Sequence, residues 1–111
     1  MVDAAIDADI TGPAVLSSAP ASGSVGIDRT TAVTVTFTEP VTGVNGVSFT
    51  LKQGSTPVAG NVAASSSSTY VLTPSSNLAA NTTYTVTLTT AIMDLSGNAL
   101  AATTITFVTG A

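Results

Sequence analysis

Two stretches of this chain alternate between threonine and an apolar side chain, strictly so at residues 33–38 and 83–89. Residues 31–38 read T-A-V-T-V-T-F-T, and residues 82–90 read T-T-Y-T-V-T-L-T-T. Successive side chains of a β-strand point to opposite faces, so a period of two separates an apolar face from a threonine face. Threonine is β-branched and suits the solvent side of a strand. The alternation therefore predicts two half-buried strands and argues against helix in both stretches.

The apolar members of these stretches are the expected core. Val35 and Phe37 point inward from the first stretch, and Tyr84 does so from the second. Apolar residues make up 44% of the chain, yet aromatic residues make up only 5%. A core built mainly from small aliphatic side chains is the thin core expected between two sheets.

Further short strands are expected between segments rich in Gly, Pro, Ser and Asn. We expect them at residues 13–20, 25–27, 47–51, 58–63, 69–73 and 103–109. Val47 is expected to point inward with Phe49 and Leu51. Residues 41–45 are expected to be a loop and 53–57 a turn. Seven or eight short strands at this spacing, without a convincing helix, predict an all-β sandwich of antiparallel strands.

Residues 78–100 refine the fold class. Leu78 stands six residues before Tyr84, and an Asp-x-x-Gly-Asn turn from Asp94 to Asn98 precedes the final strand. This arrangement is typical of the last hairpin of an immunoglobulin-like Greek-key β-sandwich. Tyr84 is then expected to form a tyrosine corner, with its ring in the core and its hydroxyl bonded to backbone near the crossover.

The composition excludes several kinds of chemistry. The chain has no Cys and no His, so it has no disulfide, no Ser–His–Asp or Cys–His nucleophile and no zinc site of the ordinary type. Only two Met residues are present, which is poor material for a copper site. No glycine-rich phosphate loop occurs, and Trp is absent. We expect a protein that is not an enzyme.

The charge balance limits the classes of partner that this chain can be expected to bind. The chain carries two basic and six acidic residues, for a net charge of −4. Nucleic acids and anionic membrane surfaces are recognised by clustered Lys and Arg, which this chain lacks. It also lacks an apolar run of 18 residues, so membrane insertion is not expected. Charged residues make up 7%, well below the roughly 25% of an average soluble protein, and this favours an extracellular location.

The domain organisation is expected to be simple. Residues 1–12 hold three of the six acids without a strand pattern and are expected to be a linker or a frayed segment. Residues 13–111 are expected to form one domain, since this length supports a single core. The first residues lack the basic and apolar regions of a signal peptide, so we expect a piece of a longer protein.

Four residues are candidate calcium ligands because carboxylate and amide oxygens suit this cation: Asp94 and Asn98 in the turn, and Asp7 and Asp9 in the first segment. The alternative for the turn is that Asp94 caps backbone N–H groups while Gly97 adopts a positive φ. The alternative for the first segment is a solvated tail. The alternative for the turn is favoured because the further carboxylates of a calcium loop are missing. The solvated tail is favoured because one domain holds only half of a junction site.

The order of many weak motifs resembles the bacterial Ig-like domain of the S-layer-protein type. The motifs are P-A-S-G at 20–23, V-G-I at 25–27, A-V-T-V-T-F-T-E-P-V at 32–41, Y-V-L-T-P at 70–74, L-A-A-N-T-T-Y at 78–84 and D-L-S-G-N-A-L at 94–100. The resemblance implies a seven-stranded sandwich that occurs in tandem in S-layer proteins, adhesins and large secreted enzymes. It also implies that calcium stiffens the domain junctions of some relatives.

The expected function is therefore structural. The chain is expected to be a non-catalytic spacer of a larger bacterial cell-surface or secreted protein, with neighbouring domains as partners and a monomeric state when isolated. One alternative is a calcium-stiffened adhesion or partner-binding module that contacts a surface protein or glycan. A second is an accessory domain of a secreted enzyme.

Overall fold

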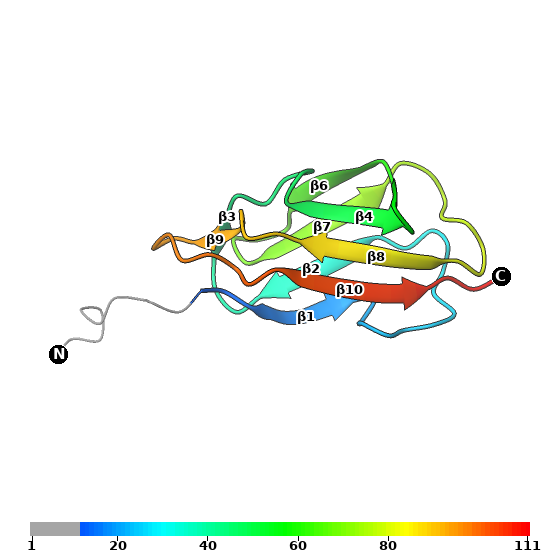
Figure 1. Ribbon diagram of the computed structural model, residues 1–111, viewed down its shortest axis with the longest axis horizontal. Helices are drawn as coiled ribbons and strands as arrows, with labels where there is room; N and C mark the ends of the chain where they lie inside the picture. Colours follow the sequence, from blue (N-terminus) through cyan, green and yellow to red (C-terminus); the bar gives the residue numbers. More distant parts are fainter. Residues whose placement is uncertain (1–11) are drawn as a thin grey trace.

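The computed structural model describes residues 12–111 as two antiparallel sheets packed face to face (Figure 1). The first sheet has the order β1 (Val15–Ala19), β2 (Val33–Phe37), β7 (Thr69–Pro74) and β6 (Gly60–Ala64). The second has the order β10 (Thr103–Val108), β8 (Thr83–Leu88), β4 (Phe49–Gln53) and β5 (Thr56–Pro57). A small third sheet joins β3 (Val41–Thr42) to β9 (Met93–Asp94).

This strand order confirms the predicted fold class. The chain crosses between the sheets after β2, after β5 and after β7, and its strands of five or more residues give the four-plus-three arrangement of an immunoglobulin-like Greek key. Among residues 12–111, seven strands have five or more residues, and β3, β5 and β9 have two each. The sandwich contains no cysteine, so side-chain packing joins the sheets where antibody domains use a disulfide.

The alternating strands build the core as their pattern predicts. The burial of β2 alternates strictly, and Val33, Val35 and Phe37 are all nearly inaccessible. In the facing sheet, Val86 of β8 stands opposite Leu51 of β4 on one side and Ile105 of β10 on the other. These neighbours fill one layer between the sheets. Burying such a side chain contributes roughly 1.5–3 kcal/mol to stability.

The prediction for Val47 was wrong. Its side chain is 82% exposed, and the strand begins two residues later, at Phe49. The cause is local. The Asn45 side chain accepts hydrogen bonds from the N–H groups of Val47 (2.8 Å) and Ser48 (3.1 Å). This Asx turn curls the backbone before the strand, so the apparent alternation does not extend to Val47.

Two short pairings were also missed, and one expected strand has different bounds. Residues 41 and 42, expected in a loop, pair as β3 with β9, and Val41 is buried. Thr56 and Pro57, expected in a turn, form β5 against β4. Residues 58–63 were expected to be a strand, but β6 covers Gly60–Ala64. A two-residue pairing carries no periodic signal, which explains why the sequence pattern missed it.

The loops gather at two opposite ends of the sandwich, visible at the left and right of Figure 1. We call residues 38–48, 65–68 and 89–102 the N pole, because β1 starts there. Residues 20–32, 75–82 and 109–111 form the C pole, where the chain ends. Among residues 12–111, no helix is long and apolar enough to cross a membrane.

Candidate functional site

Buried polar side chains are the best guide to specialised positions in this sandwich. Within the described chain, Ser48, Asp94 and Thr109 are polar and almost fully buried. All three lie at the poles. A buried polar group destabilises the fold unless it is hydrogen-bonded, so the partners of each show what it does.

Asp94 organises the turn at the N pole. Its Oδ1 accepts hydrogen bonds from the N–H groups of Ser96 (2.9 Å) and Asn98 (2.8 Å). Its Oδ2 accepts one from Nδ2 of Asn98 at 3.0 Å. Gly97 has φ +90°, a conformation that glycine adopts without steric cost. The carboxylate thus satisfies the donors of its own loop.

This geometry bears on the calcium prediction without testing it. The structure brings Asp94 and Asn98 together, while Asp7 and Asp9 lie outside the described residues. Calcium prefers six to eight oxygen ligands. Within residues 12–111, no three His, Cys, Asp or Glu side chains are grouped to hold a metal ion. A cation at Asp94 would have to compete with the loop donors that the carboxylate accepts.

Ser48 holds the loop of residues 38–48 at the N pole in place through hydrogen bonds. Its hydroxyl donates to the Gly43 carbonyl at 2.5 Å and accepts from the Asn45 N–H at 3.0 Å. Gly43 has φ +79°, and a Cβ there would lie 2.5 Å from the Ala91 carbonyl oxygen. The two loops of the pole therefore approach each other so closely that only glycine fits.

Tyr84 and Leu78 are both buried in the core near the C pole. The Tyr84 hydroxyl accepts a hydrogen bond of 2.7 Å from the Ala79 N–H, in the crossover between β7 and β8. Its ring stacks on Phe107, with ring centroids 5.8 Å apart, and Leu78 is buried beside the crossover. This is the geometry of a tyrosine corner.

Thr109 makes a second set of hydrogen bonds to the crossover at the C pole, which the sequence analysis missed. Its Oγ1 donates to the Ala79 carbonyl at 2.6 Å and accepts from the Thr82 N–H at 2.9 Å. The Thr109 N–H also donates to the Thr82 carbonyl at 2.9 Å. A signal was present, because Thr109 continues the inward series of Ile105 and Phe107 with a polar residue. A hydroxyl on the apolar face of a strand needs a buried partner.

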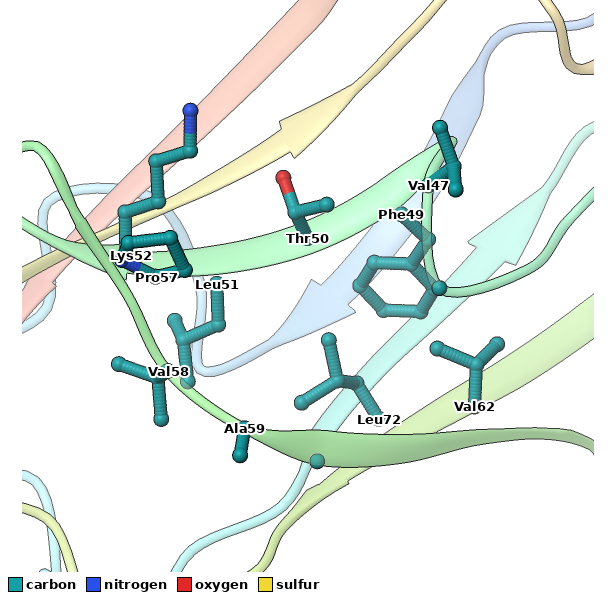
Figure 2. A pocket seen from close by; sticks show the side chains of 12 residues that line it. Val47, Phe49, Thr50, Leu51, Lys52, Pro57, Val58, Ala59, Val62 and Leu72 are labelled. Atoms are coloured by element: carbon teal, nitrogen blue, oxygen red, sulfur yellow. The ribbon is translucent and has the colours of Figure 1, made fainter.

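An apolar groove lies where the two sheets open, between β4 with β5 and the edge strand β6. It has a volume of about 440 Å³. Figure 2 shows Phe49, Leu51 and Leu72 pointing into it, while Thr50 and Lys52 point away. The lining residues contain no acid, histidine or cysteine. The groove offers mainly apolar contact, because the polar ends of Thr50 and Lys52 point away from it.

The carboxyl of Asp28 has a lowered pKa. Asp28, on the surface of the C pole, accepts hydrogen bonds from the Thr30 N–H (2.8 Å) and the Thr30 hydroxyl (2.7 Å). These bonds, the backbone one foremost, lower the pKa of the Asp28 carboxyl from its ordinary value of 3.8. The side chain is exposed, and its hydrogen bonds to Thr30 stabilise a turn.

Comparison with known proteins agrees with the fold. Residues 9–109 match the profile of a family described as bacterial Ig-like domain. Domains 1–6 of the surface layer protein SbsC are similar in structure, with a TM-score of 0.67 and 27% identity over 96% of this chain and 15% of that chain. No curated protein has a matching sequence.

Two other solved structures extend the comparison. An L,D-transpeptidase from Mycobacterium smegmatis aligns with a TM-score of 0.64 and 26% identity, over 90% of this chain and 41% of that chain. The methionine-rich copper resistance protein PcoC from Escherichia coli has a TM-score of 0.70 at 22% identity, over 89% of this chain and 99% of that chain, and shares the fold. Of the S-layer structures, the chain spans between 14% and 24% of their length.

Proposed function

Because this chain belongs to the bacterial Ig-like domain family, we propose that it is a non-catalytic spacer of a larger bacterial cell-surface or secreted protein. In this role the domain holds its neighbours apart. Its partners are the domains joined to it in the parent chain. The isolated domain is then a monomer.

The placement of the two ends carries this proposal. β1 starts at the N pole, and β10 runs the length of the sandwich to deliver the C-terminus to the C pole (Figure 1). Neighbours attached at opposite poles lie in line with the sheets. Each added copy then lengthens the array by the long dimension of the sandwich.

The chemistry of the poles and the groove supports a structural role. Asp94, Ser48 and Thr109 are engaged by backbone groups of their own loops or crossover. The groove is lined without an acid, a histidine or a cysteine. Enzyme sites combine a concave pocket with convergent polar groups of shifted pKa, whereas the shifted pKa of Asp28 belongs to a residue that does not line the groove.

The likeness to S-layer domains supports a place in a longer surface protein. This chain covers 24% of one S-layer structure and 15% of another, at 25% and 27% identity. The match is thus to a single module within a much longer chain. The low charge of the sequence agrees with an extracellular or cell-surface location.

Small-angle X-ray scattering tests the spacer proposal directly. The chain would be measured alone and as a tandem of two copies joined through their natural ends. A spacer nearly doubles the maximum dimension, because the second copy continues the axis of the first. A tandem in which the two copies lie side by side would overturn the proposal, as would a specific ligand bound at micromolar or tighter affinity.

A second candidate function is a partner-binding or adhesion module. The edge strand β6 reads G-N-V-A-A, with neither charge nor proline to guard it, and it borders the apolar groove. An unguarded edge can accept an added strand from another protein. Amide NMR would distinguish this function, since a bound surface protein or glycan would shift signals of residues 60–64.

The calcium-stiffened version of that module has its own test. Calcium titrated to several millimolar, with magnesium as the control, would shift the amides of residues 94–98 selectively if Asp94 and Asn98 are ligands. We expect no selective shift, because the Asp94 carboxylate accepts three hydrogen bonds from its own loop.

A third candidate is an accessory domain of a secreted enzyme. The L,D-transpeptidase likeness favours it, since this chain covers 41% of that protein and leaves the rest for another domain. The parent sequence on either side of this chain decides between an enzyme and an array of similar domains.

A further inference from the structure

The two large sheets have four edges, and three of them are protected against pairing with another chain. The β1 edge has a register shift between Val15 and Ser17, and such bulges disrupt edge pairing. The β5 edge is two residues long and contains Pro57. The β10 edge is covered by residues 23–27, whose parallel contact with residues 106–110 is made by backbone hydrogen bonds. Each of these devices keeps a sheet edge from accepting a strand of another molecule.

The fourth edge, strand β6, has none of these protections. It pairs with β7 without interruption from Gly60 to Ala64, and its sequence G-N-V-A-A holds no charged residue and no proline. Figure 1 shows β6 as the outermost strand of its sheet. An uncharged, uninterrupted edge is a template for pairing. Its presence beside three protected edges indicates a binding surface.

The ladder between β6 and β7 shows which backbone groups of β6 face outward. At one end of this ladder, the Ser75 N–H donates to the Ala59 carbonyl at 2.9 Å. At the other end, the Ser65 N–H donates to the Thr69 carbonyl at 2.8 Å. Residue pairs in an antiparallel ladder alternate between hydrogen-bonded and non-hydrogen-bonded. The odd-numbered residues of β6 therefore bond to β7, and the N–H and C=O groups of its even-numbered residues, with Val62 at their centre, point to the free edge.

We propose that β6 binds the β6 strand of a second copy of this chain, antiparallel and with Val62 opposite the partner's Val62. A two-fold axis through this pair sets the outward N–H and C=O groups of each copy against those of the other. The Val62 side chain is half-buried and points into the groove (Figure 2), where it packs against the same side chain of the partner. The two four-stranded sheets then form one continuous sheet.

The distribution of charge favours a second copy as the partner. The chain has a net charge of −4, so two copies repel each other in most orientations. Neither β6 nor its neighbour β7 carries a charged residue. Among residues 12–111 the acids are Asp28 in a loop of the C pole, and Glu39 and Asp94 at the N pole. At the β6 edge, two copies of this acidic chain therefore meet through strands that hold no carboxylate.

The size of the contact makes the pairing weak. One strand of five residues on each side buries less than the roughly 1,200 Å² of a stable interface, so the chain is a monomer in dilute solution. Chains that carry several copies hold them at a high local concentration, and weak contacts then reinforce one another. The paired copies run in opposite directions, as chains from two facing surfaces do. The inference rests on the proposed partner-binding function and names its partner.

Charged substitutions on the outer face of β6 test both the pairing and its register. Asn61 and Ala63 are exposed, and the proposed register sets Asn61 of each copy opposite the partner's Ala63. One variant carries Asn61→Lys with Ala63→Lys, and the other carries Asn61→Asp with Ala63→Asp. Each variant alone places like charges opposite each other, which should weaken its association about tenfold. An equal mixture of the two places opposite charges there and should associate at least as strongly as the natural chain.

Long-range attraction does not explain a recovery in the mixture. The substitutions change the net charge of −4 by two in either direction, so both variants remain acidic and repel each other at a distance. Thr104→Lys with Thr106→Lys is the matched control, because it adds the same two charges at exposed, alternate positions of the covered edge strand β10. This control should change the association constant less than twofold.

Sedimentation equilibrium of the whole chain, up to several millimolar, measures the association, and amide NMR locates it through concentration-dependent shifts of residues 60–64. We expect a weak dimer of the natural chain that both β6 variants lose and their mixture restores. A natural chain that stays monomeric at several millimolar would overturn the pairing. So would a mixture that associates no more strongly than either variant alone, or a β10 control as weak as the β6 variants.

The proposed functions fail in different experiments. The partner-binding function itself fails only if residues 60–64 also show no shift with a surface protein or glycan. For the spacer, the tandem used in scattering is measured with Asn61→Lys and Ala63→Lys in both copies as well, because joined copies could otherwise fold back and pair through β6. A compact form of this variant tandem would overturn the spacer and leave the pairing untouched.

Discussion

The loops at the two poles of the sandwich are held in place by different kinds of hydrogen bond, local at the N pole and long-range at the C pole. At the N pole, the Asp94 carboxylate accepts donors that lie two and four residues further along the chain. At the C pole, the neutral Thr109 hydroxyl bonds to groups 30 and 27 residues away. One pole is held by a local turn, and the other by the meeting of the final strand with a distant crossover. Both residues are buried and polar, and both hold loops in place. Only Asp94 could be recognised from the sequence, because its partners are its neighbours in the chain.

Removing the Asp94 carboxylate should have the largest effect. Asp94→Ala leaves two backbone N–H groups and the Asn98 amide without their acceptor in a buried turn, and we expect a loss of about 3 kcal/mol in unfolding free energy. Denaturant unfolding measures it. Asp94→Asn is the control. Its amide oxygen can take the place of Oδ1, so its loss of unfolding free energy should be about half of the loss caused by Asp94→Ala. Equal losses for both variants would show that charge matters more than the turn geometry.

Removing the Thr109 hydroxyl should cost somewhat less. Thr109→Val keeps the side-chain shape but deprives the Ala79 carbonyl and the Thr82 N–H of their partner, for an expected loss of about 2 kcal/mol. Thr109→Ser retains the hydroxyl and should lose about 1 kcal/mol or less. If valine were tolerated as well as serine, the C pole would depend on packing and not on this hydrogen bond.

The Tyr84 hydroxyl should contribute less than Thr109, because it accepts one hydrogen bond. Tyr84→Phe leaves the Ala79 N–H unpaired and should cost on the order of 1 kcal/mol, read as a lower melting temperature. Tyr70→Phe is the matched control, since the Tyr70 hydroxyl makes a longer bond of 3.3 Å to the Val41 carbonyl. An unchanged melting temperature for Tyr84→Phe would remove the tyrosine corner from the C pole.

The smallest expected effect is a pH dependence at the C pole. Hydrogen bonds from Thr30 lower the pKa of Asp28 in the folded chain below its ordinary value of 3.8. The folded state therefore holds this proton less tightly than the unfolded state. The resulting stabilisation is present above the ordinary pKa and is lost as the pH falls through the folded pKa. NMR titration should show the Asp28 pKa rising in Thr30→Ala, which keeps the backbone donor but lacks the hydroxyl.

Much of the fold could be predicted because its signals are periodic. Phe37 and Tyr84 stand in alternating runs, and both point into the core as expected. Val47 broke the rule, because the Asn45 turn overrides an alternation that is only three apolar residues long. The pairing of β3 with β9 brings together residues 41–42 and 93–94 without a pattern in either. Whether two such short segments pair is decided by the path of the loops that contain them, and not by a periodic sequence pattern.

The candidate site divides in the same way. The sequence identified Asp94, Gly97 and Asn98 as turn residues, because a turn depends on residues that are close together in the chain. Thr109 was missed, because its partners are set by where the crossover passes. The groove at Phe49, Leu51 and Leu72 was also missed, since it exists only where the edges of two sheets face each other. No run of neighbouring residues encodes such a gap.

By itself, the sequence determined the all-β class, the inward faces of the long strands, the turn at Asp94 and the absence of Cys and His chemistry. These depend on side-chain period, local hydrogen bonding and composition, all of which are local properties of the chain. Only the tertiary structure decided the opposed poles, the hydroxyl network at Thr109 and the parallel contact of residues 23–27 with 106–110. These features join residues far apart in the chain, and such contacts arise only once the two sheets have packed.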